Sequence, residues 1–198
     1  MNYNIKDYLS LFKMDENLSK KINNFIIEFK QGENQQWAKH SYGNGNPLED
    51  WQNEKEFDIA DIHWMLPENL YREIMEKIWK CLSEYCNMLG EQLNYMGHIG
   101  WNGFTSPRVN WYDKETKMDE HFDHIHSIFD GERKGIPTFT VLGLLKNADK
   151  GGELILWGEE EIKTMPGDIL VFPSNIFFRH KVNEIIEGTR VSFVSWVW

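Results

Sequence analysis

The chain has 198 residues, of which 41% are hydrophobic, which suffices for one globular domain with a sizeable core but not for two catalytic domains. Its formal net charge of −10 argues against a binder of nucleic-acid phosphates, because such a protein needs a basic surface. No secretory signal pattern opens the chain, and no apolar run is long enough for a membrane span. We therefore expect a soluble, cytoplasmic protein without a membrane partner.

The first half of the chain is predicted to be helical and irregular. Apolar residues recur at three- and four-residue steps, which predicts a helical segment over residues 1 to about 32 that ends at Gly32. The residues of this stripe are Leu18, Ile22, Phe25, Ile26 and Phe29. The polar stretch 33–56 favours a loop, with an irregular strand within it as the alternative, and residues 57–64 are a candidate short strand.

A clearer amphipathic helix is predicted to begin at Pro67 and to end at Gly90. Its apolar face is formed by Tyr71, Ile74, Met75, Ile78, Trp79, Leu82, Tyr85 and Leu89. Cys81 and Cys86 fall within this helix, where their spacing seldom suits a disulfide, and two cysteines alone do not make a zinc cluster. Reduced thiols are expected.

After Gly90 the sequence reads as short strands separated by turns. The predicted strands cover residues 108–112, 138–145, 153–157, 169–172 and 191–198, with turns at 147–152 and 165–168, and residues 160–164 lead into the second turn. The stretch 138–145 is almost continuously apolar, as in a strand covered on both faces. Helices followed by many short strands predict an α+β fold, a jelly-roll sandwich with the N-terminal helices packed on one sheet.

A metal-ligand pattern begins with His121 and Asp123. In a β-strand, residues two apart project from the same side, so both side chains can reach one ion. A third ligand must come from another strand, and His180 follows an apolar run far downstream. Two histidines and one carboxylate form a facial Fe(II) site that leaves positions open for oxygen and an oxidisable ligand. His124 and His126 are rivals for the metal, but a continuing strand would turn them to the other face.

Two alternatives remain for this pattern. The three ligand residues could form a hydrogen-bonded surface cluster without a metal. A second metal site could be read into the neighbouring acidic residues, although a solvated loop is the simpler interpretation of them. These acidic residues are Asp113, Glu115, Asp119 and Glu120.

Arg190 adds a candidate anion site. It shares one face of an otherwise apolar strand with Ser192, and an unpaired guanidinium there would be costly. A buried anionic ligand would satisfy it, since the planar fork matches a carboxylate. The alternative is a surface ion pair with Glu187.

These residues resemble the double-stranded β-helix (cupin-like) core of the Fe(II)- and 2-oxoglutarate-dependent dioxygenases, in particular the prolyl 4-hydroxylase-like branch. The resemblance covers roughly residues 108–198. Its motifs, in the order of the family, are Tyr112, the pair His121 and Asp123, the turn Gly151-Gly152-Glu153, the segment from Met165 to Pro173, His180, Arg190 and Trp196. Met118 and Leu144 depart from the aromatic residues common in the family, so the resemblance does not fix the substrate.

The resemblance implies a role for each motif. His121, Asp123 and His180 would hold Fe(II) and form the catalytic centre. Residues of the core strands would bind the cosubstrate 2-oxoglutarate, namely Arg190, Tyr112, Thr140 and Ser192. Trp196 would contact the substrate. O2 is the other cosubstrate, and L-ascorbate is a further cofactor of the family.

The predicted function is hydroxylation of an amino-acid side chain, with proline in a peptide or protein as the first choice, and release of succinate and CO2. One alternative is the same chemistry on a free amino acid or small metabolite, and another is a non-catalytic cupin-like metal-binding sandwich. The sequence leaves the substrate and the oligomeric state open.

The expected organisation is one dioxygenase domain over residues 1–198. Residues 1–106 would give helical and irregular support, and residues 107–198 would form the catalytic jelly roll. The stretches 33–56 and 124–137 are candidate lids over the substrate.

Overall fold

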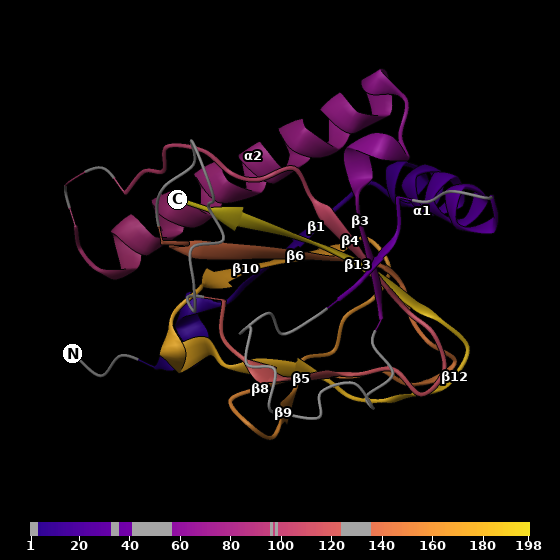
Figure 1. Cartoon of the computed structure of the whole chain (residues 1–198). Helices are drawn as coiled ribbons and strands as arrows, with labels where there is room; N and C mark the ends of the chain where they lie inside the picture. Colours follow the sequence, from indigo (N-terminus) through magenta and orange to yellow (C-terminus); the bar gives the residue numbers. More distant parts are fainter. Residues whose placement is uncertain (1–3, 33–35, 41–56, 96, 98, 124–135) are drawn as a thin grey trace.

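The computed structural model describes residues 4–32, 36–40, 57–95, 97, 99–123 and 136–198. Two β-sheets lie one above the other, and the long helices α1 and α2 cover the outer face of the larger sheet (Figure 1). The helices are η1 (Ile5–Tyr8), α1 (Glu16–Gln31), η3 (Ile62–Trp64), α2 (Glu68–Gln92) and η4 (Ile176–Phe178).

The larger sheet has seven strands in the order β1-β10-β6-β13-β4-β3-β2. Each strand pairs antiparallel with its neighbours. The bounds are β1 Ser10–Lys13, β2 Ala38–Lys39, β3 Asp58–Asp61, β4 Arg108–Tyr112, β6 Phe139–Lys146, β10 Asp168–Pro173 and β13 Arg190–Val197.

The smaller sheet has four strands in the order β5-β11-β8-β9, and β12 and β7 form a separate two-stranded ribbon. The bounds are β5 Met118–His121, β7 Lys150–Gly151, β8 Leu154–Leu156, β9 Glu160–Glu161, β11 His180–Val182 and β12 Ile185–Glu187. This arrangement agrees with the predicted α+β jelly roll with helices on one sheet.

Capping residues and a proline mark the ends of the two long helices. The Asp15 side chain caps α1 by accepting from the backbone N–H groups of Asn17 and Leu18, at 3.0 and 3.1 Å. Gly32 is the C-cap of α1, as predicted. The second helix starts one residue after Pro67 and continues past Gly90, which it tolerates in its last turn.

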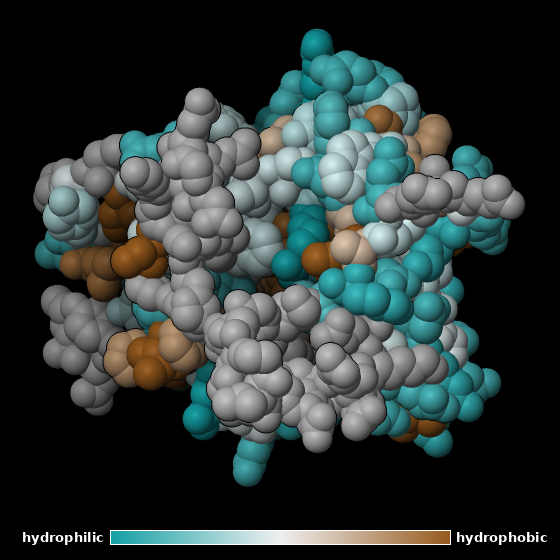
Figure 2. Space-filling model, in the orientation of Figure 1, coloured by the Kyte–Doolittle hydropathy of each residue, from teal (hydrophilic) through white to brown (hydrophobic). Residues whose placement is uncertain are grey.

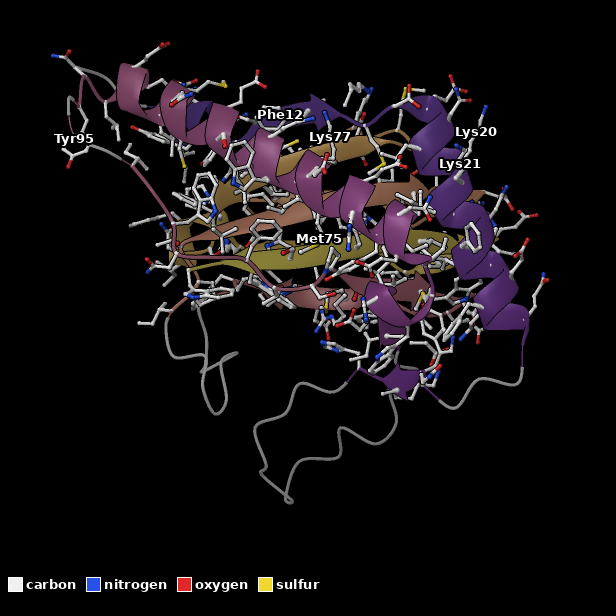
Figure 3. The ribbon with its side chains drawn as sticks, turned by 90° about the horizontal axis from the view of Figure 1, so that it is seen from above. Phe12, Lys20, Lys21, Met75, Lys77 and Tyr95 are labelled. Atoms are coloured by element: carbon white, nitrogen blue, oxygen red, sulfur yellow. The ribbon has the colours of Figure 1, made fainter. Side chains whose placement is uncertain are left out.

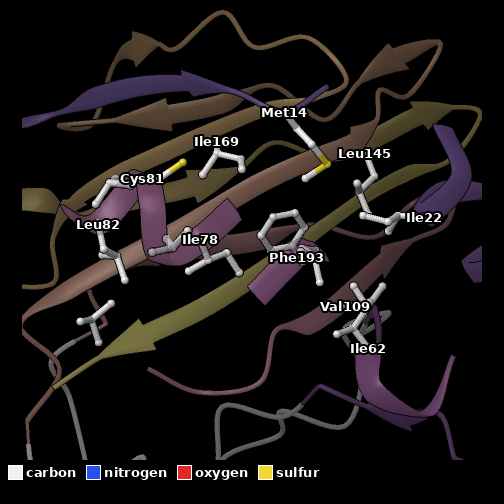
Figure 4. Packing of buried hydrophobic residues seen from close by; sticks show 14 of the residues in the cluster. Met14, Ile22, Ile62, Ile78, Cys81, Leu82, Val109, Leu145, Ile169 and Phe193 are labelled. Atoms are coloured by element: carbon white, nitrogen blue, oxygen red, sulfur yellow. The ribbon is translucent and has the colours of Figure 1, made fainter. Parts of the chain in front are cut away.

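A hydrophobic core joins both helices to the larger sheet. Figure 3 shows α2 crossing above the strands, and Figure 4 shows the packing beneath it. Ile78 and Leu82 of α2, Ile22 of α1, and Ile169 and Phe193 of the sheet are among its fully buried members. The 3.6-residue period therefore identified most of the buried face of each helix, but Phe25 of α1 and Trp79 of α2, which were assigned to these faces, are exposed.

Side chains along β13 and β4 point alternately toward this core and toward the space between the two sheets. On β13, Val191 and Phe193 pack under the helices, whereas Arg190 and Ser192 line a cavity on the other side. β4 behaves likewise, because Tyr112 faces the cavity. The period of two thus places polar side chains between the sheets within strands that are otherwise apolar.

Several elements differ from the prediction. Residues 10–13 form the edge strand β1 against β10, although a helix was predicted across the whole lead-in. β3 stops at Asp61, and a 3-10 turn replaces the rest of the strand predicted over 57–64. Residues 160–164, which were expected only to lead into a turn, begin with the two-residue strand β9. Short strands that the sequence missed are β7, β11 and β12, each of three residues or fewer. The strand expected around His121 is β5, which ends at that residue.

The face shown in Figure 2 carries extensive hydrophilic areas with smaller hydrophobic ones, as the acidic composition predicts. None of the described helices combines the length and the apolar character that crossing a membrane requires. His124 and His126 lie outside the described residues, as do most of the two predicted lids, 33–56 and 124–137.

Candidate functional site

Three predicted ligand residues meet in the space between the two sheets. His121 ends β5 and His180 begins β11, and the two residues pair directly across these strands. Asp123 follows in a bend after β5 rather than in the strand itself. One nitrogen or oxygen atom from each of the three residues lies within 4.8 Å of the others, close enough to hold one metal ion.

Backbone carbonyls fix both imidazole rings. Nδ1 of His121 lies 2.8 Å from the carbonyl oxygen of Asp119, and Nδ1 of His180 lies 3.0 Å from that of Phe178. Since a carbonyl only accepts, each Nδ1 carries the proton and each Nε2 presents a lone pair. Both Nε2 atoms face Asp123, at 3.6 and 4.0 Å from its carboxylate oxygens.

The protonation states of these groups suit a cation. Burial lowers the pKa of His121 to about 4, with a further contribution from His180, so the ring is neutral at physiological pH. Burial alone would raise the pKa of Asp123, but His180, His121 and the Thr140 hydroxyl hold it below its ordinary value. His121 therefore offers a neutral nitrogen and Asp123 an anion, as a metal ion requires of its ligands.

Thr140 orients the carboxylate. Its hydroxyl, which we expected to contact 2-oxoglutarate, donates to an oxygen of Asp123 at 2.6 Å. The same hydroxyl lies 2.8 Å from that of Ser174. Thr140 is fully buried, so in this structure it contacts a ligand residue rather than the cavity.

Arg190 lies in the same cavity and is only 1% exposed. Its Nη1 donates to the Ser192 hydroxyl at 2.8 Å, and its Nη2 has no hydrogen-bond partner within the described residues. Burial lowers the pKa of Arg190, partly offset by Tyr112, yet a guanidinium stays protonated near neutral pH. The alternative of an ion pair with Glu187 is not observed in the described structure.

Aromatic rings support this guanidinium. The centroid of the Tyr112 ring lies 5.5 Å from Cζ of Arg190. Tyr112 stacks on Phe57, with centroids 4.2 Å apart, and Phe57 stacks on His40. Burial raises the pKa of Tyr112, so its hydroxyl keeps its proton and can donate to an anion.

Gly152 makes room for Arg190. It has φ +75°, and a Cβ atom there would come within 3.3 Å of Cδ of Arg190 and 2.6 Å of Ile185. Only glycine adopts this backbone conformation readily. The glycine-containing turn between β7 and β8 thus contributes to the shape of the anion site.

Sequence reasoning missed part of the cavity wall. The cavity is lined by Arg108, Asn110, Tyr112, Met118, His121, Asp123, Leu142, His180, Val182, Arg190, Ser192, Val194 and Trp196. Arg108 and Asn110 were not predicted, although the alternation that places Tyr112 in the cavity places them there too. Trp196 was predicted to contact the substrate, and its ring lies under the Arg108 guanidinium at 4.8 Å.

A larger cavity, of about 710 Å³, lies between α2 and residues 99–104. Its walls include Trp79 and Trp101, whose rings meet edge to face. The metal-ligand set lies between the sheets instead, on the other face of the larger sheet. The candidate site is therefore identified by its metal-ligand residues and not by the volume of its cavity.

Comparison with known proteins agrees with this geometry. Residues 107–198 match the model of the 2OG-Fe(II) oxygenase superfamily. A PKHD-type hydroxylase of Idiomarina loihiensis is 36% identical over 93 residues, which are 45% of this chain and 40% of that protein. A PKHD-type hydroxylase of Prochlorococcus marinus is 32% identical over 89 residues, 43% of this chain and 39% of the relative. The chain thus spans about two fifths of the length of these curated relatives.

Solved structures share the fold. A prolyl hydroxylase from Trichoplax adhaerens, in complex with a hypoxia inducible factor oxygen degradation domain peptide fragment, has a TM-score of 0.67 at 17% identity, covering 97% of this chain and 84% of that one. A Pseudomonas putida prolyl-4-hydroxylase has a TM-score of 0.63 at 14% identity, covering 98% of this chain and 95% of that one. The predicted resemblance and the double-stranded β-helix fold are thereby confirmed.

Proposed function

We propose that this chain, related through residues 107–198 to the 2OG-Fe(II) oxygenase superfamily, is an Fe(II)- and 2-oxoglutarate-dependent dioxygenase. One observation carries the proposal: the His-Asp-His cluster shares its cavity with a buried arginine that has an unpartnered nitrogen. A metal site alone fits many functions. A metal site beside an unsatisfied buried guanidinium fits a ligand that is both a chelator and an anion.

His121, Asp123 and His180 would hold the Fe(II) ion. Their donor set suits iron, since imidazole and carboxylate together form the facial site of non-haem Fe(II) oxygenases. The carbonyl-bound Nδ1 atoms hold both rings in the orientation that a metal requires. Thr140 restrains the carboxylate in the same way.

Arg190 would bind the far carboxylate of 2-oxoglutarate. Its Nη2 is the donor that lacks a partner, and Tyr112 supplies a protonated hydroxyl in the same cavity. Ser192, which accepts from Nη1, keeps the fork in place and can turn toward the cosubstrate. Charge-assisted hydrogen bonds of this kind contribute about 1.5–3 kcal/mol each.

When bound, Fe(II) with 2-oxoglutarate and O2 supplies oxidative decarboxylation coupled to hydroxylation of a C–H bond, with release of succinate and CO2. The chain's own residues bind and orient these groups and exclude water. The inward-facing apolar residues Leu142, Val182 and Val194 keep the cavity dry between its polar ends.

We propose proline in a peptide or protein as the substrate. The two solved structures described above are prolyl hydroxylases, and the one from Trichoplax adhaerens holds a peptide fragment. We propose further that residues 1–198 act as one domain, in which residues 1–106 support the catalytic core. β1, β2 and β3, which join the larger sheet, support this view. L-ascorbate, which would restore oxidised iron, belongs to the proposal as well.

The test incubates the purified chain with Fe(II), ascorbate, 2-oxoglutarate and proline-containing peptides. Mass spectrometry of the peptides and succinate measurement follow. We expect a one-oxygen gain on proline with stoichiometric succinate, and no gain in alanine-substituted peptides. Hydroxylation of free proline at the same efficiency would move the substrate to the small-molecule class. Succinate formation that no proline compound stimulates would contradict the substrate assignment.

A further inference from the structure

A second arginine lies in the cavity and has no role in holding the metal or 2-oxoglutarate. Arg108 is half-buried on β4, and its guanidinium lies over the Trp196 ring, with Cζ 4.8 Å from the centroid. Its Nε donates to the side-chain oxygen of Asn110 at 3.1 Å. The Trp196 ring thus covers one face of the guanidinium, and Asn110 accepts from its Nε. The edge formed by the two Nη groups is available to bind an anion.

No carboxylate in the described residues pairs with this free edge. Asp123 is the one acidic residue among those that line the cavity, and it is a proposed metal ligand. Asp61 lies directly opposite Arg108 across β3 and β4, but its carboxylate accepts from the Ser106 hydroxyl at 2.6 Å and from the backbone of His63 at 2.8 Å. Within the described chain, Arg108 forms no ion pair at 4 Å or less.

Charge balance in the loaded site leaves Arg108 uncompensated. A divalent metal ion and the dianion of 2-oxoglutarate cancel each other. The Asp123 carboxylate, which acts on Arg108 electrostatically but is also a proposed metal ligand, offsets only one of the two guanidinium groups, so the loaded site keeps one net positive charge. A partly desolvated guanidinium without a counter-ion is unfavourable, so a further anion is needed when the site is full.

The far carboxylate of 2-oxoglutarate, which we propose binds Arg190, does not supply that anion, and the near carboxylate is needed to chelate the metal. Arg190 donates to Ser192, whereas Arg108 stacks on Trp196, which lies four positions further along β13. Four positions, from Ser192 to Trp196, span about 13 Å along a strand, which is more than the length of a five-carbon dicarboxylate. Trp196 pairs with Thr140 across the sheet, and Thr140 donates a hydrogen bond to Asp123. Because Arg108 lies over Trp196, it lies at the metal end of the cavity. The substrate must reach this end to be hydroxylated.

We propose that Arg108 binds a carboxylate of the substrate beside the metal site, so that the enzyme selects acidic substrates. The inference rests on the proposed function and deepens it. The carboxylate comes either from the chain end of a peptide or free amino acid, or from an aspartate or glutamate next to the hydroxylated residue. Trp196 positions the guanidinium by covering its face, and Asn110 positions it by holding Nε, which reduces the ordering cost of binding.

The test measures peptide affinity with four probes. They are acetylated Ala-Pro-Ala with a free carboxyl end, its C-terminal amide, and the amide with aspartate or with asparagine as the last residue. Isothermal titration calorimetry without O2 gives each dissociation constant for the protein loaded with Fe(II) and 2-oxoglutarate. In the parent protein, we expect a carboxylate-bearing probe to bind about tenfold or more tightly than its neutral counterpart.

The four probes distinguish the two sources of the carboxylate, and two variants test whether Arg108 causes the preference. A preference for the free carboxyl end assigns the α-carboxylate, and a preference for the aspartate peptide assigns a side chain. The preference should vanish in Arg108→Met and persist in Arg72→Met, the same change at an exposed arginine of α2 that pairs with Glu68. Equal affinity for acidic and neutral probes in the parent, no binding of either acidic probe, or a preference that survives Arg108→Met overturns the inference.

The same protein is first titrated with 2-oxoglutarate alone. Saturable 2-oxoglutarate binding without any acidic preference refutes only the role of Arg108. Absence of 2-oxoglutarate binding refutes the proposed function together with this inference.

Discussion

Replacing Arg190 by methionine should have opposite effects on stability and on cosubstrate binding. Methionine keeps a long apolar stem in β13 and removes the guanidinium. That group is 1% exposed and has one nitrogen without a partner in the described structure. Without an anion, the buried charge destabilises the folded chain, because its desolvation is only partly offset by Ser192 and the Tyr112 ring.

The magnitudes follow from these contacts. The lost hydrogen bond to Ser192 costs about 1 kcal/mol, whereas relief of an uncompensated buried charge is worth several kcal/mol. We therefore expect the ligand-free Arg190→Met protein to be at least as stable as the parent, with a Tm higher by about 2–4 °C for each net kcal/mol. Two lost charge-assisted bonds to 2-oxoglutarate should weaken its binding by about two orders of magnitude or more.

Differential scanning fluorimetry with and without 2-oxoglutarate measures both effects in one assay, with Mn(II) in place of Fe(II) to prevent turnover. The parent should gain Tm as 2-oxoglutarate is added, and Arg190→Met should start higher and gain little. Arg190→Lys should fall between them, since an ammonium keeps the charge and loses the planar fork. A lower Tm in Arg190→Met together with an unchanged 2-oxoglutarate response would refute the reasoning and assign Arg190 a structural role.

Three further substitutions test the surroundings of the site. Gly152→Ala should lower the free energy of unfolding by about 1–2 kcal/mol, because of its φ of +75°, and should weaken 2-oxoglutarate binding by displacing Arg190. Denaturant unfolding and calorimetry check this, and parent-like values in both would contradict it. Thr140→Val should weaken Fe(II) binding about 10–100-fold in chelator competition, because Asp123 loses its hydrogen bond, and unchanged affinity would argue against it. His40→Phe should make the free energy of unfolding depend less steeply on pH on the acid side. Burial lowers the His40 pKa from 6.5 to about 3, so between these values the unfolded chain binds more protons than the folded chain. The parent protein therefore loses stability as the pH decreases through this range. The slope should decrease by at most about 1.4 kcal/mol per pH unit, and an unaltered slope would exclude His40 as its source.

The sequence predicted the C-terminal half of the fold better than the lead-in. Strands such as β4 and β6 carry strong apolar patterns, and the structure has them within a residue or two of their predicted bounds. β1 has only four residues, and its partner β10 lies far away in the chain, so its strand character depends on tertiary pairing that no local pattern encodes. The same reason explains the missed strand β11, which pairs on both sides.

The candidate site was predicted from residue types more than from local structure. The strand β5 ends at His121, so strand alternation alone does not position Asp123. Its hydrogen bond with Thr140 contributes to that position. Alternation along β4 could have identified Arg108, because Tyr112 on the same strand was already assigned to the site. That signal was available in the sequence, whereas the missing counter-ion became visible only in three dimensions.

The most direct test of the account is whether the chain binds Fe(II) and 2-oxoglutarate together. Adding 2-oxoglutarate to the Fe(II)-loaded protein without O2 should produce a saturable metal-to-ligand charge-transfer absorption band at one equivalent per chain. Asp123→Ala should abolish this band while its far-ultraviolet circular dichroism remains that of the parent. The absence of a saturable band in the parent protein would contradict the assignment of the chain as a 2-oxoglutarate-dependent dioxygenase.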